Sequence, residues 1–162
     1  MSELIRYIGI GLILLSALAV SRWYERFIRR RIAEDEGFSA LLLHIRAGVE
    51  CFLSSAEELL RGFENEALMN AGYLGGDGAD ICERFRRSSE RLCISDKVRG
   101  ILRDFFDSFG KEYKSGTVAL IDRTRAALDE HIKAERESAE KDVKLVRTVL
   151  LSAALGAVIL LI

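Results

Sequence analysis

The chain has 162 residues, with 24 Lys and Arg against 25 Asp and Glu, and 49% of its residues are apolar. A near-neutral charge gives no basic field for nucleic acid, and the apolar content is too high for a disordered chain. The three cysteines have no C-x-x-C spacing, which excludes a disulfide framework and a zinc knuckle. There is no proline, a residue that would interrupt a helix wherever it fell, so the sequence predicts an all-α fold.

Residues 1–20 are predicted to form an N-terminal transmembrane helix. Between Leu4 and Val20 the only charge is Arg6, and this run would span roughly 26 Å as a helix, close to the ~30 Å of a hydrocarbon core. A second interpretation is a signal peptide that is cleaved after Ala17-Leu18-Ala19. The arginine-rich stretch that follows favours an uncleaved anchor, because positive charge holds its side of a span in the cytoplasm.

The arginine-rich stretch of residues 22–31 contains five arginines and one glutamate. Arg22, Trp23 and Tyr24 directly follow the apolar run, where an aromatic belt and basic residues are expected at a membrane interface. These arginines either bind anionic lipid headgroups or only fix the topology, and the two interpretations are compatible.

Residues 148–162 are predicted to form a C-terminal transmembrane helix, because this stretch carries no charge. Arg147 precedes it and could snorkel to the headgroups. Two spans would place residues 21–147 in the cytoplasm and both termini outside. Ser152 and Gly156 are small residues four apart, so they are candidates for intramembrane helix packing.

The cytosolic region is predicted to be a helical bundle. Gly37 precedes one apolar stripe that runs from Phe38 to Leu53 at helical spacing. Two overlapping capping boxes within Ser54–Glu58 predict the start of a second helix, whose stripe ends at Leu68. The glycine-rich segment Gly72–Gly78 is the clearest predicted break.

Three further helices are expected after the glycine-rich break. The first is weak and runs from Ile81 to Leu92. The next begins at Ser95 with a cap and ends at Gly110, and it has the most regular apolar stripe of the chain. After Gly116 no break is predicted, and Ile121, Leu128 and Ile132 fall on one narrow helical stripe. The charged helix would therefore run straight into the C-terminal span.

No enzyme, cofactor or metal site is expected. His44 and Cys51 roughly share a helix face, yet no further ligand has suitable spacing, and cysteines on apolar stripes usually pack in a core. Cys82 and Cys93 are expected to pack in the helix after the glycines, and His131 to be solvated. The segment Gly75–Gly78 lacks a following G-K-[ST], so a surface turn is favoured over a phosphate loop.

Three stretches resemble the stage III sporulation protein AB family. Ile101–Lys111 is similar to the family's leucine-rich helix ending in Phe-Gly, and Ala126–Lys144 to its Ala/Glu/Lys-rich helix. The ending Leu155–Ile162 is also similar. One departure is Tyr113–Gly116, which stands where the family usually has Leu-Gly followed by an Asp and a Gln.

The resemblance implies a bundle similar to the cytosolic domains of type II secretion and type IV pilus inner-membrane platform proteins. It further implies membership of a channel complex that joins mother cell and forespore during endospore formation. The expected partners are membrane lipids, other channel proteins including a cytosolic secretion-type ATPase on the mother-cell side, and a second copy of the chain. The alternatives are a secretion or pilus platform unrelated to sporulation, and a membrane-tethered thiol or metal sensor.

Overall fold

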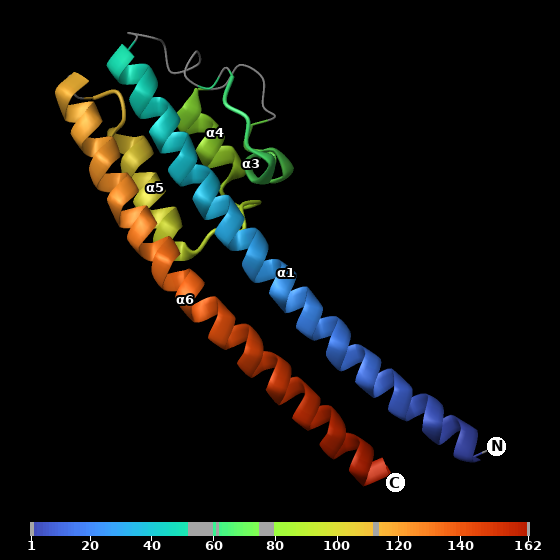
Figure 1. Cartoon of the computed structure of the whole chain (residues 1–162). Coiled ribbons are helices and arrows are strands. Elements are labelled where there is room, and N and C mark those ends of the chain that lie inside the picture. The colour runs from blue at the N-terminus through green and yellow to red at the C-terminus, as the bar shows by residue number, and fades with distance from the viewer. Residues whose placement is uncertain (1, 52–59, 61, 75–79, 112–113, 162) are drawn as a thin grey trace. The chain divides into compact units, whose positions relative to one another are not determined.

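A computed structural model describes residues 2–51, 60, 62–74, 80–111 and 114–161, and every regular element among them is a helix. The helices are α1 (Ser2–Cys51), α3 (Glu66–Asn70), α4 (Ile81–Ser88), α5 (Asp96–Ser108) and α6 (Lys114–Leu161) (Figure 1). The described residues thus confirm the all-α prediction.

The chain divides into two compact units. The two-helix unit consists of Met1–Arg29 and Arg136–Ile162, and the core unit consists of Arg30–Glu135. Helices α1 and α6 contribute residues to both. The predicted membrane boundaries, after residues 20 and 147, lie within the two-helix unit and stay predictions.

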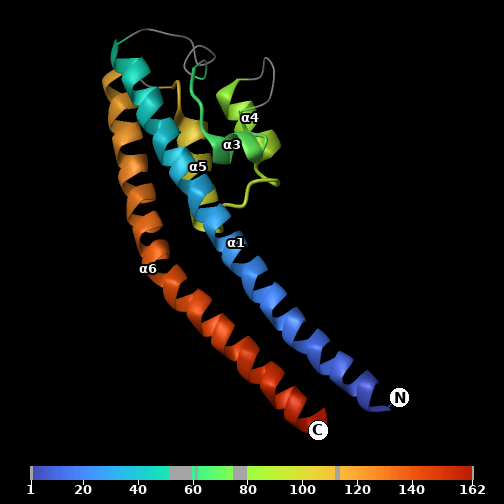
Figure 2. The ribbon, with the colours of Figure 1, turned by 45° about the vertical axis from the view of Figure 1, so that its right-hand side comes forward.

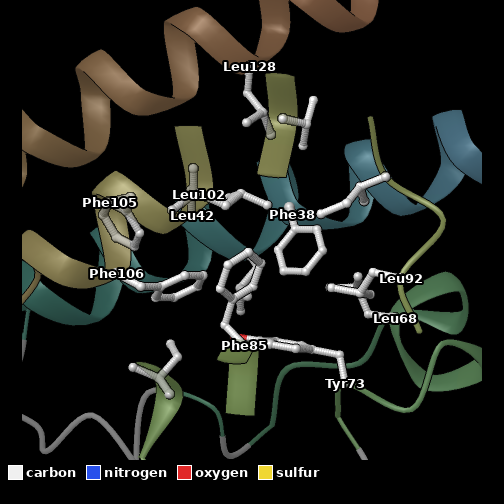
Figure 3. Close-up of a cluster of buried hydrophobic side chains, with 14 of the residues drawn as sticks. Phe38, Leu42, Leu68, Tyr73, Phe85, Leu92, Leu102, Phe105, Phe106 and Leu128 are labelled. Atoms are coloured by element: carbon white, nitrogen blue, oxygen red, sulfur yellow. The ribbon is translucent and has the colours of Figure 1, made fainter. Parts of the chain in front are cut away.

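The core unit is built around one apolar cluster. Figures 1 and 2 both show its parts of α1 and α6 side by side, and Arg46 of α1 donates a hydrogen bond from Nε to Oδ1 of Asp122 on α6 at 2.7 Å. Aromatic rings fill the centre: the Phe38 and Tyr73 rings are 5.1 Å apart, and the Phe85 and Phe106 rings 4.8 Å (Figure 3). The buried members of the cluster are Phe38, Leu41, Leu42, Ile45, Leu68, Ala71, Tyr73, Ile81, Phe85, Leu92, Ile94, Val98, Leu102, Phe105, Phe106, Ile121, Leu128 and Ile132.

Helix α1 continues through Gly37, where the sequence placed a glycine ahead of an apolar stripe. A Cβ added to Gly37 would lie 2.8 Å from Cγ of Leu68 and 2.9 Å from Oδ1 of Asn65. The glycine is therefore explained by the close approach of α3 to α1. Phe38, Leu41, Leu42 and Ile45 of the predicted stripe are fully buried, while Phe52 and Leu53 lie outside the described residues.

The predicted second helix, ending at Leu68, is interrupted. Gly62 has a φ of +82° and residues 63–65 are not helical, so α3 begins separately. Asn65 caps it, its side chain accepting a hydrogen bond from the Leu68 N–H at 3.1 Å. The predicted capping boxes at Ser54–Glu58 lie outside the described residues.

Helices α5 and α6 agree with their sequence signals, whereas α4 ends at Ser88, before the predicted end at Leu92. The Ser95 hydroxyl caps α5 by accepting from the Val98 N–H at 3.2 Å, and Gly110, with a φ of +82°, follows its end. Helix α6 runs from Lys114 to Leu161 without interruption, as predicted. Ile121 and Leu128 of its stripe are fully buried in the core unit.

In the two-helix unit, α1 and α6 lie side by side (Figures 1 and 2). Where the structure describes side chains of this unit, the buried apolar ones are small: Ala17 on α1 and Ala154 on α6. Large apolar side chains of both helices are instead exposed: Tyr7, Ile8, Leu12, Leu15, Leu18, Val20, Trp23, Phe27, Leu145, Val149, Leu155 and Ile159.

Candidate membrane interface and buried charged cluster

Among the described residues, one helix is long and apolar enough to cross a membrane. It lies in the stretch Tyr7–Glu50, which contains an 18-residue window of mean hydropathy 1.4 with none of that window buried. This agrees with an N-terminal span by length and composition. The C-terminal span of residues 148–162 stays a prediction.

The predicted interface residues on α1 lie just past this apolar segment. Arg22 is exposed, and Trp23 is 65% exposed and stacks on Phe27 with the ring centroids 5.9 Å apart. Tyr24 is half-buried, so it faces differently from its neighbours. A large aromatic pair open to solvent, next to basic side chains, is the arrangement found where a helix leaves a bilayer.

The interface residue predicted on α6 has a similar setting. Arg147 is exposed, as are the preceding Lys141 and Lys144. One turn beyond Lys144, the Thr148 hydroxyl donates to the Lys144 carbonyl at 2.9 Å, which satisfies this polar side chain within its own helix.

The small residues proposed for intramembrane packing face away from the partner helix of the same chain. Ser152 and Gly156 are both exposed, and a Cβ added to Gly156 would meet no described atom within 4 Å. Ala154, between them, is the buried small residue of this segment. Packing of Ser152 and Gly156 therefore stays a prediction, and it would need a second chain.

A buried charged cluster occupies the core unit at the end nearest Arg30 and Glu135. Glu34 is fully buried and is well satisfied: Nε of Arg30 donates to its Oε1 at 2.7 Å, and the Cys93 N–H donates to its Oε2 at 2.5 Å. Through the second bond, Glu34 ties the segment between α4 and α5 to helix α1.

Asp35 lies beside Glu34, is fully buried, and has no hydrogen-bond partner for either carboxyl oxygen among the described residues. The pKa of Asp35 is raised to about 8, first by burial and second by the nearby charge of Glu135, while the charge of Arg31 opposes the shift. Arg31 forms an ion pair with Glu135 across α1 and α6. In the described part of this cluster, Arg30 pairs with Glu34 and Arg31 with Glu135, and the raised pKa of Asp35 favours its protonated form at neutral pH.

His131 completes the cluster on α6 and is not solvated, contrary to expectation. Its side chain is only 18% exposed, and its Nε2 lies 2.9 Å from the Ser95 hydroxyl and 3.5 Å from Oε2 of Glu135. The same serine caps α5, so His131 joins α6 to the start of that helix.

A periodic signal for this cluster was present in the sequence. Asp35 lies three residues before Phe38 and seven before Leu42, so it extends the buried stripe of α1. Glu135 extends the stripe of α6 in the same way, three residues after Ile132. Acidic residues on an apolar stripe predict buried charge, and sequence reasoning overlooked them.

The cysteines show no activated thiol in the described part of the chain. Cys82 is half-buried, its Sγ lies 3.1 Å from the Phe106 carbonyl oxygen, and burial first and Asp80 second raise its pKa to about 11. Burial likewise raises the pKa of Cys93, which lies past the end of α4 rather than in it. Both thiols are free, and a raised pKa disfavours the nucleophilic thiolate.

His44 is half-buried, with its ring centroid 5.2 Å from that of Phe63. The Cys51 side chain lies outside the described set, so the predicted spatial relation of these two residues is untested. In the described ranges, no three His, Cys, Asp or Glu side chains gather as a metal site.

One comparison with known proteins gives a match. The family model for stage III sporulation protein AB matches residues 6–162. No curated protein matches the chain, and no solved structure matches it either.

Proposed function

Because the chain belongs to the stage III sporulation protein AB family, which implies a role in sporulation, we propose that it is a non-catalytic membrane platform. In this proposal it is part of the channel complex between mother cell and forespore. Residues 21–147 lie on the mother-cell side, where they receive a cytosolic secretion-type ATPase.

The observation that carries the proposal is the contrast between the two units. In the core unit most large apolar side chains are buried in one cluster, and Leu43 and Met69 are exposed exceptions. In the two-helix unit both helices expose large apolar side chains along their length, with Leu12 at 62% and Ile159 at 72%. Exposure of this kind costs free energy in water and is favourable in hydrocarbon. This exposure supports a pair of membrane-spanning helices in which Thr148–Ile162 is the second span.

Helices α1 and α6 each supply residues to both units, which suits a platform. A partner docked on the core unit would then be linked to the membrane segments by two helical connections rather than a loop. The buried charged cluster lies largely on these two helices, and its ion pair between Arg31 and Glu135 joins them in the core unit.

Deletion of the gene and truncation of the chain test the proposal. Loss of the protein should leave vegetative growth unaffected and block spore development after engulfment. A chain stopped after Arg147 should give the same defect, because it keeps the core unit but lacks the second anchor.

The control variants address a site of chemistry. Changing His44 to Asn, or Cys51, Cys82 and Cys93 to Ser, should still allow sporulation, with at most a modest loss of stability. Normal spores from the truncated chain would contradict the platform role. Loss of spores in the folded His44 or cysteine variants would favour the thiol or metal sensor instead.

A further inference from the structure

Three arginines form one face of α1 immediately after its apolar segment. Arg22, Arg26 and Arg29 lie at i, i+4 and i+7, which places them within roughly 60° of one another around the helix. All three are exposed, and all belong to the two-helix unit.

This face has more positive charge than its protein partners neutralise. Arg29 donates to Oε1 of Glu25 at 2.7 Å, in a pair whose side chains are 78% and 40% exposed. Neither Arg22 nor Arg26 has a described acidic group within 4 Å. Surface pairs contribute little free energy, so the Glu25 contact does not remove the need for further anions.

The stacked pair of Trp23 and Phe27 indicates how deep the arginine face lies in the membrane. Trp23 and Phe27 stack on each other yet are 65% and 39% exposed, so water would surround much of two large rings. Trp23 lies about 4.5 Å along the helix beyond Val20, and Arg26 about 9 Å beyond it. The headgroup layer is roughly 5–8 Å thick on each side, so Arg22 lies at headgroup depth. Arg26 and Arg29, about 9 and 13.5 Å beyond Val20, reach this depth through long side chains that extend back toward the bilayer.

Helix α6 brings basic residues into the same unit. Lys141, Lys144 and Arg147 are exposed on the approach to the expected second span, with Glu140 directly before them and Asp142 between Lys141 and Lys144. The acidic residues reduce the charge of this segment, so the arginine face of α1 is the stronger anion-binding surface.

We infer that Arg22, Arg26 and Arg29 bind the headgroups of anionic phospholipids, with Trp23 and Phe27 inserted beside them at the interface. This inference rests on the proposed membrane anchoring and goes beyond it, because a topology signal alone requires no enrichment of any lipid. Near a membrane surface each basic residue adds about 1 kcal/mol of attraction to anionic lipid, which is about a fivefold enrichment.

The single tryptophan of the chain provides the measurement. The full-length protein is reconstituted in phosphatidylcholine vesicles that contain the same small fraction of either brominated phosphatidylglycerol or brominated phosphatidylcholine. Bromine quenches tryptophan fluorescence only at contact. We expect brominated phosphatidylglycerol to quench Trp23 more strongly than brominated phosphatidylcholine does at the same fraction, to an extent that corresponds to a local enrichment of about fivefold or more. This preference should weaken at high salt.

The triple variant Arg22→Gln, Arg26→Gln, Arg29→Gln should remove this preference while Trp23 stays quenched by both lipids. The matched control is Arg86→Gln with Arg87→Gln, two arginines of α4 whose side chains are 74% and 71% exposed. This control should keep the preference of the wild type.

Two outcomes overturn the inference at different levels. Equal quenching by both brominated lipids in the wild-type protein, or an unchanged preference in the triple variant, refutes headgroup binding and leaves the platform role intact. If neither lipid quenches Trp23 while aqueous iodide does, the membrane anchoring fails, and the proposed function fails with it.

Discussion

Replacement of Asp35 by Asn should make the core unit more stable at neutral pH, although it removes a buried carboxyl next to an arginine. The pKa of this carboxyl is raised from 3.8 to about 8, mainly by burial. Between pH 3.8 and about pH 8, Asp35 is ionised in the unfolded chain but still protonated in the folded chain. The free energy of unfolding therefore falls as the pH rises, by about 1.4 kcal/mol per pH unit, and levels off above the folded pKa.

From pH 4 to pH 7 this linkage amounts to about 4 kcal/mol. A neutral amide has nearly the shape of the protonated carboxyl and cannot ionise. The Asn variant should thus match the wild type within about 1 kcal/mol at pH 4 and exceed it by about 4 kcal/mol at pH 7.

The assay is urea unfolding of residues 21–147, followed by far-UV circular dichroism across this pH range. Only the difference between variant and wild type is interpreted, so the titration of other groups cancels. Asp35→Leu is the second variant: it removes the charge without adding an amide, so it should lose the same part of the pH dependence.

The opposite result would refute the reasoning. If Asp35 were ionised and paired with Arg31, removal of its charge would cost about 3–5 kcal/mol at pH 7, because a buried partner charge would be left behind. A variant less stable than the wild type at pH 7, with an unchanged slope against pH, would show that Asp35 is an anion in the folded protein.

Three further predictions concern the fold and the topology. Gly37→Ala should destabilise the core unit by about 1 kcal/mol, because the added Cβ would crowd Leu68 and the Asn65 cap. The Cβ of Gly100→Ala meets no described atom within 4 Å, so this variant should stabilise α5 by up to about 1 kcal/mol. Chemical denaturation of both variants measures the difference. Residues 21–147 alone should be strongly helical and unfold cooperatively, and a far-UV spectrum dominated by strand or coil would contradict the bundle. A membrane-impermeant maleimide should label the three native cysteines only after permeabilisation; labelling in intact cells would instead support the cleaved signal peptide.

The sequence alone determined the features that depend on local periodicity. The lack of proline and the spacing of Ile121, Leu128 and Ile132 predicted the uninterrupted helix α6, and Ser95 and Gly110 bounded α5 correctly. Each of these signals lies within one helix or at its ends, because helix formation and capping depend on neighbours within about four residues.

Only the tertiary structure decided which side chains meet across helices. It placed α3 against Gly37, which explains the glycine by close approach rather than as a boundary, and it gave His131 a partner in Ser95. It also joined Arg31 to Glu135, 104 positions further along the chain, with Asp35 buried beside them. Helical periodicity shows that Asp35 and Glu135 share the buried faces of their helices, but the distance between two helices is a long-range property. The packing of α1 against α6 sets that distance, and the distance determines whether Asp35 keeps its proton.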